Sequence, residues 1–107
     1  YLRDGKEEDM PAVYHLVKEL AEYERCPQEV ETTLESMRED AFGEKPIMAF
    51  MVAEMDGKVV GLSLYFMAYS SWKGRCLYLE DLVVTQSARG LGIGKALFEA
   101  TARKANQ

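Results

Sequence analysis

The sequence of 107 residues has few of the side chains that bind metals or form disulfides, with two cysteines and one histidine. Cys26 and Cys76 lie far apart and lack the spacing of metal ligands. We therefore expect no metal and two free thiols, which are typical of the reducing cytoplasm. No apolar run reaches the roughly 18 residues of a membrane span. Charges at Arg3, Asp4 and Lys6 also argue against a signal peptide or an anchor.

An excess of basic residues is absent as well, since 13 lysines and arginines stand against 18 acidic residues, a net charge of -5. A surface that binds phosphate backbones needs basic side chains, so a nucleic-acid partner is not expected. The acidic balance suits a cationic substrate, although a solvated acidic surface has the same composition. Hydrophobic content of 48% and charged content of 29% are ordinary for a globular protein. We expect one domain over residues 1–107.

Apolar spacing and turn residues predict the order of the elements. A first strand ends at Arg3, and a helix capped by Asp9 ends near residues 25–27. Thr32 and Glu35 have the spacing of a capping box, which predicts a second helix to about Ala41, ended by Gly43. The remaining segments are strands over 47–54, 59–69 and 77–84, a turn at Asp56-Gly57, and a helix from Gly94 to Gln107. His15 lies off the apolar stripe of the first helix and is read as a surface residue.

The stretch from Leu77 to Leu97 organises the chain, because an apolar strand leads into a glycine-rich turn and then a helix. Gly90, Gly92 and Gly94 have no Cβ atoms, and they lie at the start of the predicted helix, where the backbone amides are unpaired. Those amides, the helix dipole and Arg89 predict a site for a phosphate or pyrophosphate. The spacing fits neither the dinucleotide fingerprint nor a Walker loop.

The pattern Arg89-x-x-Gly92-x-Gly94, with Gln86 before it, resembles the acetyl-CoA signature of the GNAT acetyltransferases. The segments 69–75 and 78–81 resemble those of the spermidine/spermine and thialysine acetyltransferase branch. This resemblance implies an α/β fold with a mixed, mainly antiparallel sheet flanked by helices. It further implies acetyl transfer from acetyl-CoA directly to a primary amine of a small molecule, and a homodimer.

Several site residues follow from the resemblance alone. In the GNAT superfamily the strand before the turn splays at a bulge, and its free backbone groups pair with the pantetheine arm of the cofactor. Leu82 and Val84 would supply those groups here, although their side chains also suit ordinary sheet packing. The pyrophosphate would be held by Arg89, Gly90, Leu91, Gly92, Ile93, Gly94 and Lys95. Lys95 could equally be a solvated lysine.

Glu80 is the candidate base. A protonated alkyl amine has a pKa of about 10 and must lose its proton before it attacks a thioester. The glutamate that matches Glu80 is the proposed base of this branch, acting through a water. A role limited to hydrogen bonding within the sheet is the alternative. Alternation along the strand points Asp81 to the opposite face from Glu80. Glu24, Trp72, Glu80 and Asp81 are the residues expected to contact the amine.

Two features bear on the substrate. Glu19, Glu22, Glu24, Glu29 and Glu31 gather around the end of the first helix, which in the resembled family forms part of the wall near the amine; solvation is the alternative for each of them. Family members that favour polyamines tend to carry an acidic residue just before the tryptophan segment. Ser70 and Ser71 stand there instead, as in the thialysine-type members.

The end of the sequence leaves two interpretations open. The complete family fold adds a strand, a helix and a final strand pair, together with a tyrosine that protonates the departing thiolate, and no residue here matches that tyrosine. The sequence is therefore either the first two-thirds of a longer acetyltransferase or a complete protein that lost half of the site. The alternatives to an enzyme are a non-catalytic CoA-binding module and an interaction domain whose glycines serve close packing.

Overall fold

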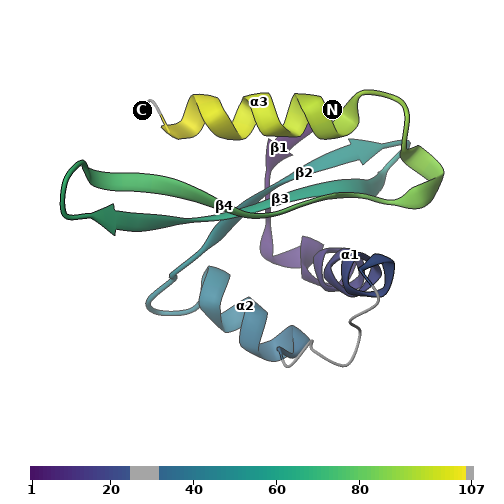
Figure 1. Ribbon diagram of the computed structural model, residues 1–107. Helices are drawn as coiled ribbons and strands as arrows, with labels where there is room; N and C mark the ends of the chain where they lie inside the picture. Colours follow the sequence, from purple (N-terminus) through teal and green to yellow (C-terminus); the bar gives the residue numbers. More distant parts are fainter. Residues whose placement is uncertain (25–31, 106–107) are drawn as a thin grey trace.

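The protein has three layers, with one sheet between helices on both of its faces (Figure 1). The computed structural model describes residues 1–24 and 32–105. Helix α3 covers one face of the sheet, and helices α1 and α2 cover the other. The arrangement confirms the α/β class and the mainly antiparallel sheet expected from the sequence.

The sheet has four strands in the order β1-β2-β3-β4, and every neighbouring pair is antiparallel. The strands are β1 (Leu2–Asp4), β2 (Ala49–Met55), β3 (Lys58–Ser70) and β4 (Gly74–Val84). The expected turn joins β2 and β3, where Asp56 and Gly57 have φ of 54° and 79°. Positive φ at both residues is typical of a two-residue hairpin turn whose twist matches that of the strands. Strands β3 and β4 extend further toward their shared turn than the sequence predicted.

The helices are α1 (Met10–Tyr23), α2 (Leu34–Phe42) and α3 (Ile93–Ala105), with 3-10 turns η1 (Glu7–Asp9) and η3 (Gln86–Ala88). His15 is exposed on α1, as expected. The predicted capping box of α2 is wrong by one residue: Thr33 Oγ1 accepts from the Ser36 amide at 3.0 Å, and Ser36 Oγ accepts from the Thr33 amide at 2.9 Å. Serine at the third position thus does what was expected of Glu35. Within the described ranges no helix is long and apolar enough to cross a bilayer.

Two apolar cores hold the layers together. The larger lies under α1 and α2 and includes Met10, Leu16 and Leu62. The smaller lies under α3, where Leu97 is fully buried against the sheet. A Cβ atom added at Gly61 of β3 would lie 2.9 Å from Leu97 Cδ1, so glycine permits this close approach.

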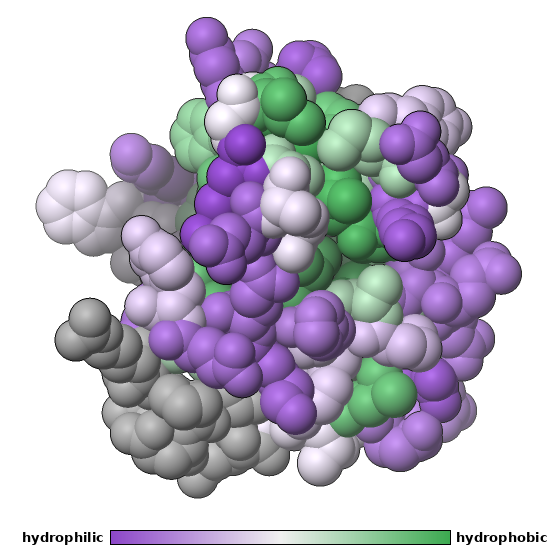
Figure 2. All heavy atoms as spheres, turned by 90° about the vertical axis from the view of Figure 1, so that its right-hand side faces the viewer, coloured by the Kyte–Doolittle hydropathy of each residue, from purple (hydrophilic) through white to green (hydrophobic). Residues whose placement is uncertain are grey.

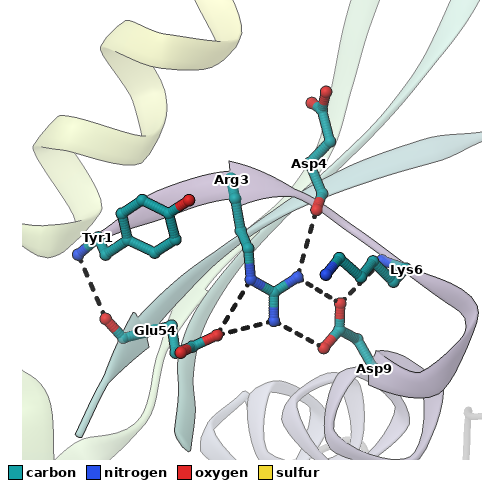
Figure 3. Close-up of polar contacts among 6 residues, drawn as sticks. All are labelled: Tyr1, Arg3, Asp4, Lys6, Asp9 and Glu54. Carbon is teal, nitrogen blue, oxygen red and sulfur yellow. Dashed lines mark hydrogen bonds and ion pairs between the residues drawn. The ribbon is translucent and has the colours of Figure 1, made fainter. Parts of the chain in front are cut away.

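An arginine cluster joins the start of the chain to the sheet (Figure 3). The Arg3 guanidinium donates to both Asp9 carboxylate oxygens, at 2.8 and 3.0 Å, and to Glu54 Oε1. Asp9 also accepts from the Lys6 amide at 2.8 Å. Asp9 occupies the N-cap position of α1, as predicted. Its side chain bonds Arg3 and the Lys6 amide, however, and not the amides of α1. The hydrogen bonds between Arg3 and Asp9 lower the pKa of the aspartate and raise the pKa of the arginine.

Candidate active site

Strand β4 carries a bulge at the candidate base. Leu64 pairs with Asp81 and its neighbour Tyr65 pairs with Leu79, so Glu80 is the extra residue in the register. A bulge breaks the alternation of side chains and re-aims those beside it. The resemblance to the GNAT superfamily implied a bulge in this strand, but the sequence around Glu80 has no glycine or other local signal that marks its position.

Two other carboxylates, Glu80 and Glu24, lie within electrostatic range of Asp81 beside this bulge. Burial raises the pKa of Asp81, and the negative charges of Glu80 and of Glu24, at the end of α1, raise it further. Leu79 lines a hollow together with α3, and Val83 belongs to the core under α1. The extra residue therefore places Glu80 and Asp81 on the same side of β4, and the expected alternation between them is wrong. Among the described residues no cation opposes this shift at Asp81. The site thus concentrates negative charge at the junction of α1 and β4, as a cationic ligand requires.

At the end of β4 every second residue points its backbone groups away from β3. The amide of Thr85, just beyond β4, donates to the Val60 carbonyl at 2.8 Å, toward β3. Because these groups alternate along a strand, those of Val84 and Leu82 point to the other side. In the described chain β4 pairs with β3 alone, and the Val84 carbonyl accepts from Arg89 Nε at 3.0 Å. The free edge of β4 therefore presents the backbone groups of Leu82 and the amide of Val84, while the Val84 carbonyl is bonded to Arg89.

The glycine turn between η3 and α3 presents backbone amides. Gly90 and Gly92 have φ of 88° and 78°, a region that other residues rarely adopt. A Cβ atom at either position would meet no atom within 4 Å, so these two glycines are not required by close packing. The Ala96 amide donates to the Gly92 carbonyl at 3.1 Å, whereas the amides of residues 93–95 have no acceptor among the described residues. These amides fit the expected pyrophosphate.

The turn lies on a face of mixed character. Figure 2 shows apolar side chains in the upper middle of this face, bordered by hydrophilic ones. Leu91, within the turn, is 64% exposed, and Lys95 lies in the first turn of α3. The described chain holds no group of three or more histidine, cysteine or acidic residues that could bind a metal.

The side chain of Arg89 faces α1. Its Nε donates to the Val84 carbonyl, its guanidinium lies 5.0 Å from the Tyr23 ring centroid, and its Nη2 lies 3.8 Å from Glu19 Oε2. Glu19 in turn accepts from Thr85 Oγ1 and from the Gln86 amide, each at 2.9 Å. Sequence reasoning grouped Glu19 with the acidic wall or with solvated residues and missed this contact. Only the fold brings together residues 66 positions apart in the chain.

Trp72 lies apart from the carboxylates. It is 95% exposed in the turn that joins β3 to β4, at the far end of the hairpin in Figure 1. Ser70 Oγ accepts from the amides of Trp72 and Lys73, at 3.3 and 3.2 Å, so this serine shapes the turn. Glu80 is eight residues further along β4, a distance of roughly 26 Å on an extended strand. Glu29 and Glu31 of the expected acidic wall lie outside the described residues.

Comparison with known families supports the same assignment. Residues 10–107 match the family model described as acetyltransferase (GNAT) family. The chain belongs to the GNAT acetyltransferases. A thialysine N-epsilon-acetyltransferase from Bos taurus is 41% identical over 97% of the chain, and one from Mus musculus is 37% identical. The chain spans 66% of the length of each of these two relatives. A spermidine/spermine N(1)-acetyltransferase-like protein from Homo sapiens is 37% identical over 92% of the chain and 15% of its own length.

Solved structures confirm the GNAT fold. A possible acetyltransferase from Clostridium difficile 630 superposes with a TM-score of 0.79 at 18% identity, over the whole of this chain and 71% of its own. An aminoglycoside acetyltransferase from an uncultured soil metagenomic sample superposes with a TM-score of 0.77 at 20% identity, over 99% of this chain and 69% of its own. At such identities the agreement concerns the arrangement of the GNAT chain and not its substrate.

Proposed function

We propose that this GNAT chain transfers the acetyl group of acetyl-CoA to a primary amine of a small molecule, a diamine, a polyamine or a thialysine-like amino acid. The observation that carries the proposal is the bulge of β4, which places Glu80 next to the half-buried Asp81, about ten residues before the glycine turn and within electrostatic range of Glu24. Negative charge attracts the ammonium form of such a substrate. The names of the curated relatives support the substrate class.

Acetyl-CoA would supply an activated thioester. The chain would hold its pyrophosphate with the amides of the glycine turn, from Arg89 to Lys95, and would pair its pantetheine arm with the backbone of Leu82 and Val84. The open space around Gly90 and Gly92, the unpaired amides of residues 93–95 and the outward backbone of β4 support this arrangement.

Glu80 would remove the proton of the ammonium group through a bridging water, which leaves a lone pair for direct attack. Its exposed place at the bulge supports this role, because a bulged residue is left out of the regular pairing of the strands. Asp81 and Glu24 would hold the cationic amine beside the base. Ser70, which shapes the hairpin turn instead of adding a carboxylate there, favours a thialysine-like substrate over a polyamine.

Two further properties remain proposals. A homodimer is supported by the exposed aromatic residues of the β3-β4 hairpin, where Trp72 is 95% and Tyr69 78% exposed. In a homodimer, the exposed Trp72 side chain would be buried against the second copy of the chain. A reducing compartment such as the cytoplasm is supported by Cys76, which is an exposed free thiol.

The test is calorimetric binding of acetyl-CoA to the chain, combined with acetylation assays on thialysine and on spermidine with the same sample. We expect binding and a higher kcat/KM for thialysine. Binding without turnover of either amine would instead support a non-catalytic CoA-binding module. Absence of binding would refute the proposed cofactor site.

A further inference from the structure

The carboxylate of Glu19 connects α1 to the segment that precedes the glycine turn. It accepts hydrogen bonds from Thr85 Oγ1 and the Gln86 amide, both at 2.9 Å, and lies 3.8 Å from Arg89 Nη2. The Glu19 side chain is 21% exposed, so solvent screens these contacts less than those of a fully exposed residue. The carboxylate of Glu19 therefore contacts three residues of the segment 85–89, namely Thr85, Gln86 and Arg89.

The segment 85–89 sets the path of the glycine turn. Its amides form one backbone bond to β3, from Thr85 to the Val60 carbonyl, and two bonds within the segment, from Ala88 to the Thr85 carbonyl at 3.0 Å and from Arg89 to the Gln86 carbonyl at 3.3 Å. Gly90 and Gly92 follow at once and have wide conformational freedom in an unrestrained chain. A ligand that orders such a turn loses affinity to the conformational entropy of ordering. Restraint from Glu19 lowers that loss before the ligand arrives.

Tyr23 adds a second contact from the same face of α1. It lies four residues after Glu19, one helical turn along, and the Arg89 guanidinium lies 5.0 Å from its ring centroid. Arg89 is thus held by the Val84 carbonyl, by Glu19 and by Tyr23. The next residue of the chain is Glu24, which belongs to the acidic group near Asp81. Helix α1 therefore contacts both the glycine turn and the proposed amine site.

We propose that Glu19 is a positioning residue, which clamps the segment 85–89 to α1 and thereby fixes the glycine turn for the pyrophosphate of CoA. The inference rests on the proposed function for its ligand, but the clamp itself is a property of the free protein.

Hydrogen exchange of the free protein tests the clamp directly. Glu19→Ala removes the acceptor of the Gln86 amide, and Glu22→Ala makes the same change on an exposed position of α1. We expect exchange at Gln86 and through the glycine turn to become about tenfold faster in Glu19→Ala and to stay at the parent rate in Glu22→Ala. Equal exchange rates in the two variants would overturn the clamp.

Binding and kinetics test its consequence. Glu19→Ala should weaken CoA binding, measured by calorimetry, about tenfold, and Glu19→Gln, which keeps one acceptor for the Gln86 amide, should recover part of that loss. With saturating acetyl-CoA, kcat should remain within about twofold of the parent while KM for acetyl-CoA rises. Unchanged CoA affinity in Glu19→Ala, or a fall in kcat with KM constant, would contradict the positioning role.

The two proposals fail in different ways. If the parent binds no CoA, the proposed function is wrong, while the exchange experiment still decides whether Glu19 orders the turn. If the parent binds CoA and Glu19→Ala binds it equally well, the positioning role is wrong and the function stands. Should Glu19→Ala fail to fold, Thr85→Val carries the test, because it removes only the hydroxyl that donates to Glu19. Parent-like exchange and CoA affinity in Thr85→Val and Glu19→Gln would then overturn the clamp.

Discussion

The molecule holds two groups of carboxylates in which the pKa of an aspartate is shifted in opposite directions. Near the chain start, Asp9 and Glu54 share the guanidinium of Arg3, and the pKa of Asp9 is lowered (Figure 3). At the bulge of β4, Asp81 is half-buried beside Glu80 and Glu24, and its pKa is raised. The first group favours the charged form of its aspartate, and the second disfavours it.

This difference separates a structural role from a binding role. Both carboxylate oxygens of Asp9 and the Oε1 of Glu54 accept hydrogen bonds from Arg3, so these carboxylates are paired within the chain and stabilise the fold. The Asp81 group carries an electrostatic cost that a cationic ligand would offset, and such costs are typical of functional sites. The same residue type therefore has opposite expected effects on stability in the two places.

The largest expected effect concerns the base. Glu80→Gln should lower kcat for amine acetylation by roughly 10²–10³-fold, because loss of general-base catalysis has effects of this order. Acetyl-CoA binding by calorimetry should remain close to that of the parent, since the glycine turn is unchanged. Unaltered turnover in Glu80→Gln would show that another group accepts the proton.

The next effect concerns stability. Asp9→Asn should lower the free energy of unfolding by about 3 kcal/mol, because it removes the charge that pairs with the largely buried Arg3. Asp56→Asn, at the β2-β3 turn, is the matched control and should change stability by less than about 0.5 kcal/mol, since asparagine tolerates positive φ. Urea unfolding at pH 7 measures both variants. A similar loss in both would remove the special role of the Arg3 cluster.

The sequence predicted the Asp81 group less well than it predicted the fold. Helix periodicity, the Asp56-Gly57 turn and the Arg-x-x-Gly-x-Gly pattern are local signals, and the elements and the glycine turn followed from them. The bulge at Glu80 is a property of pairing between β3 and β4, and it reversed the expected direction of Asp81. The contacts of Glu19 and of Arg3 join segments distant in sequence, so no local pattern could reveal them.

A smaller effect of opposite sign is expected at the bulge. Asp81→Asn should raise the free energy of unfolding at pH 7, by up to about 1 kcal/mol, because it removes a charge disfavoured by burial and by two like charges. The same variant should raise KM for the amine, since the ammonium loses part of its attraction. Asp40→Asn, on the partly exposed surface of α2, is a control for the substitution itself. Destabilisation by Asp81→Asn would contradict the contrast between the two groups.

The smallest expected effect is the order in which the stability changes of Asp81→Asn and Asp9→Asn disappear as the pH is lowered. The folded pKa of Asp81 is raised, so its charge costs stability at neutral pH, and that cost disappears as pH falls to about 4, the ordinary value of an aspartate. The folded pKa of Asp9 is lowered, so its contribution is complete above about pH 4 and is lost only as pH falls below that value. Urea unfolding between pH 7 and pH 3 should therefore show the Asp81→Asn gain vanish first, while the Asp9→Asn penalty is still nearly whole. If the penalty at Asp9 faded at the higher pH, Asp9 would not be the carboxylate that Arg3 keeps ionised.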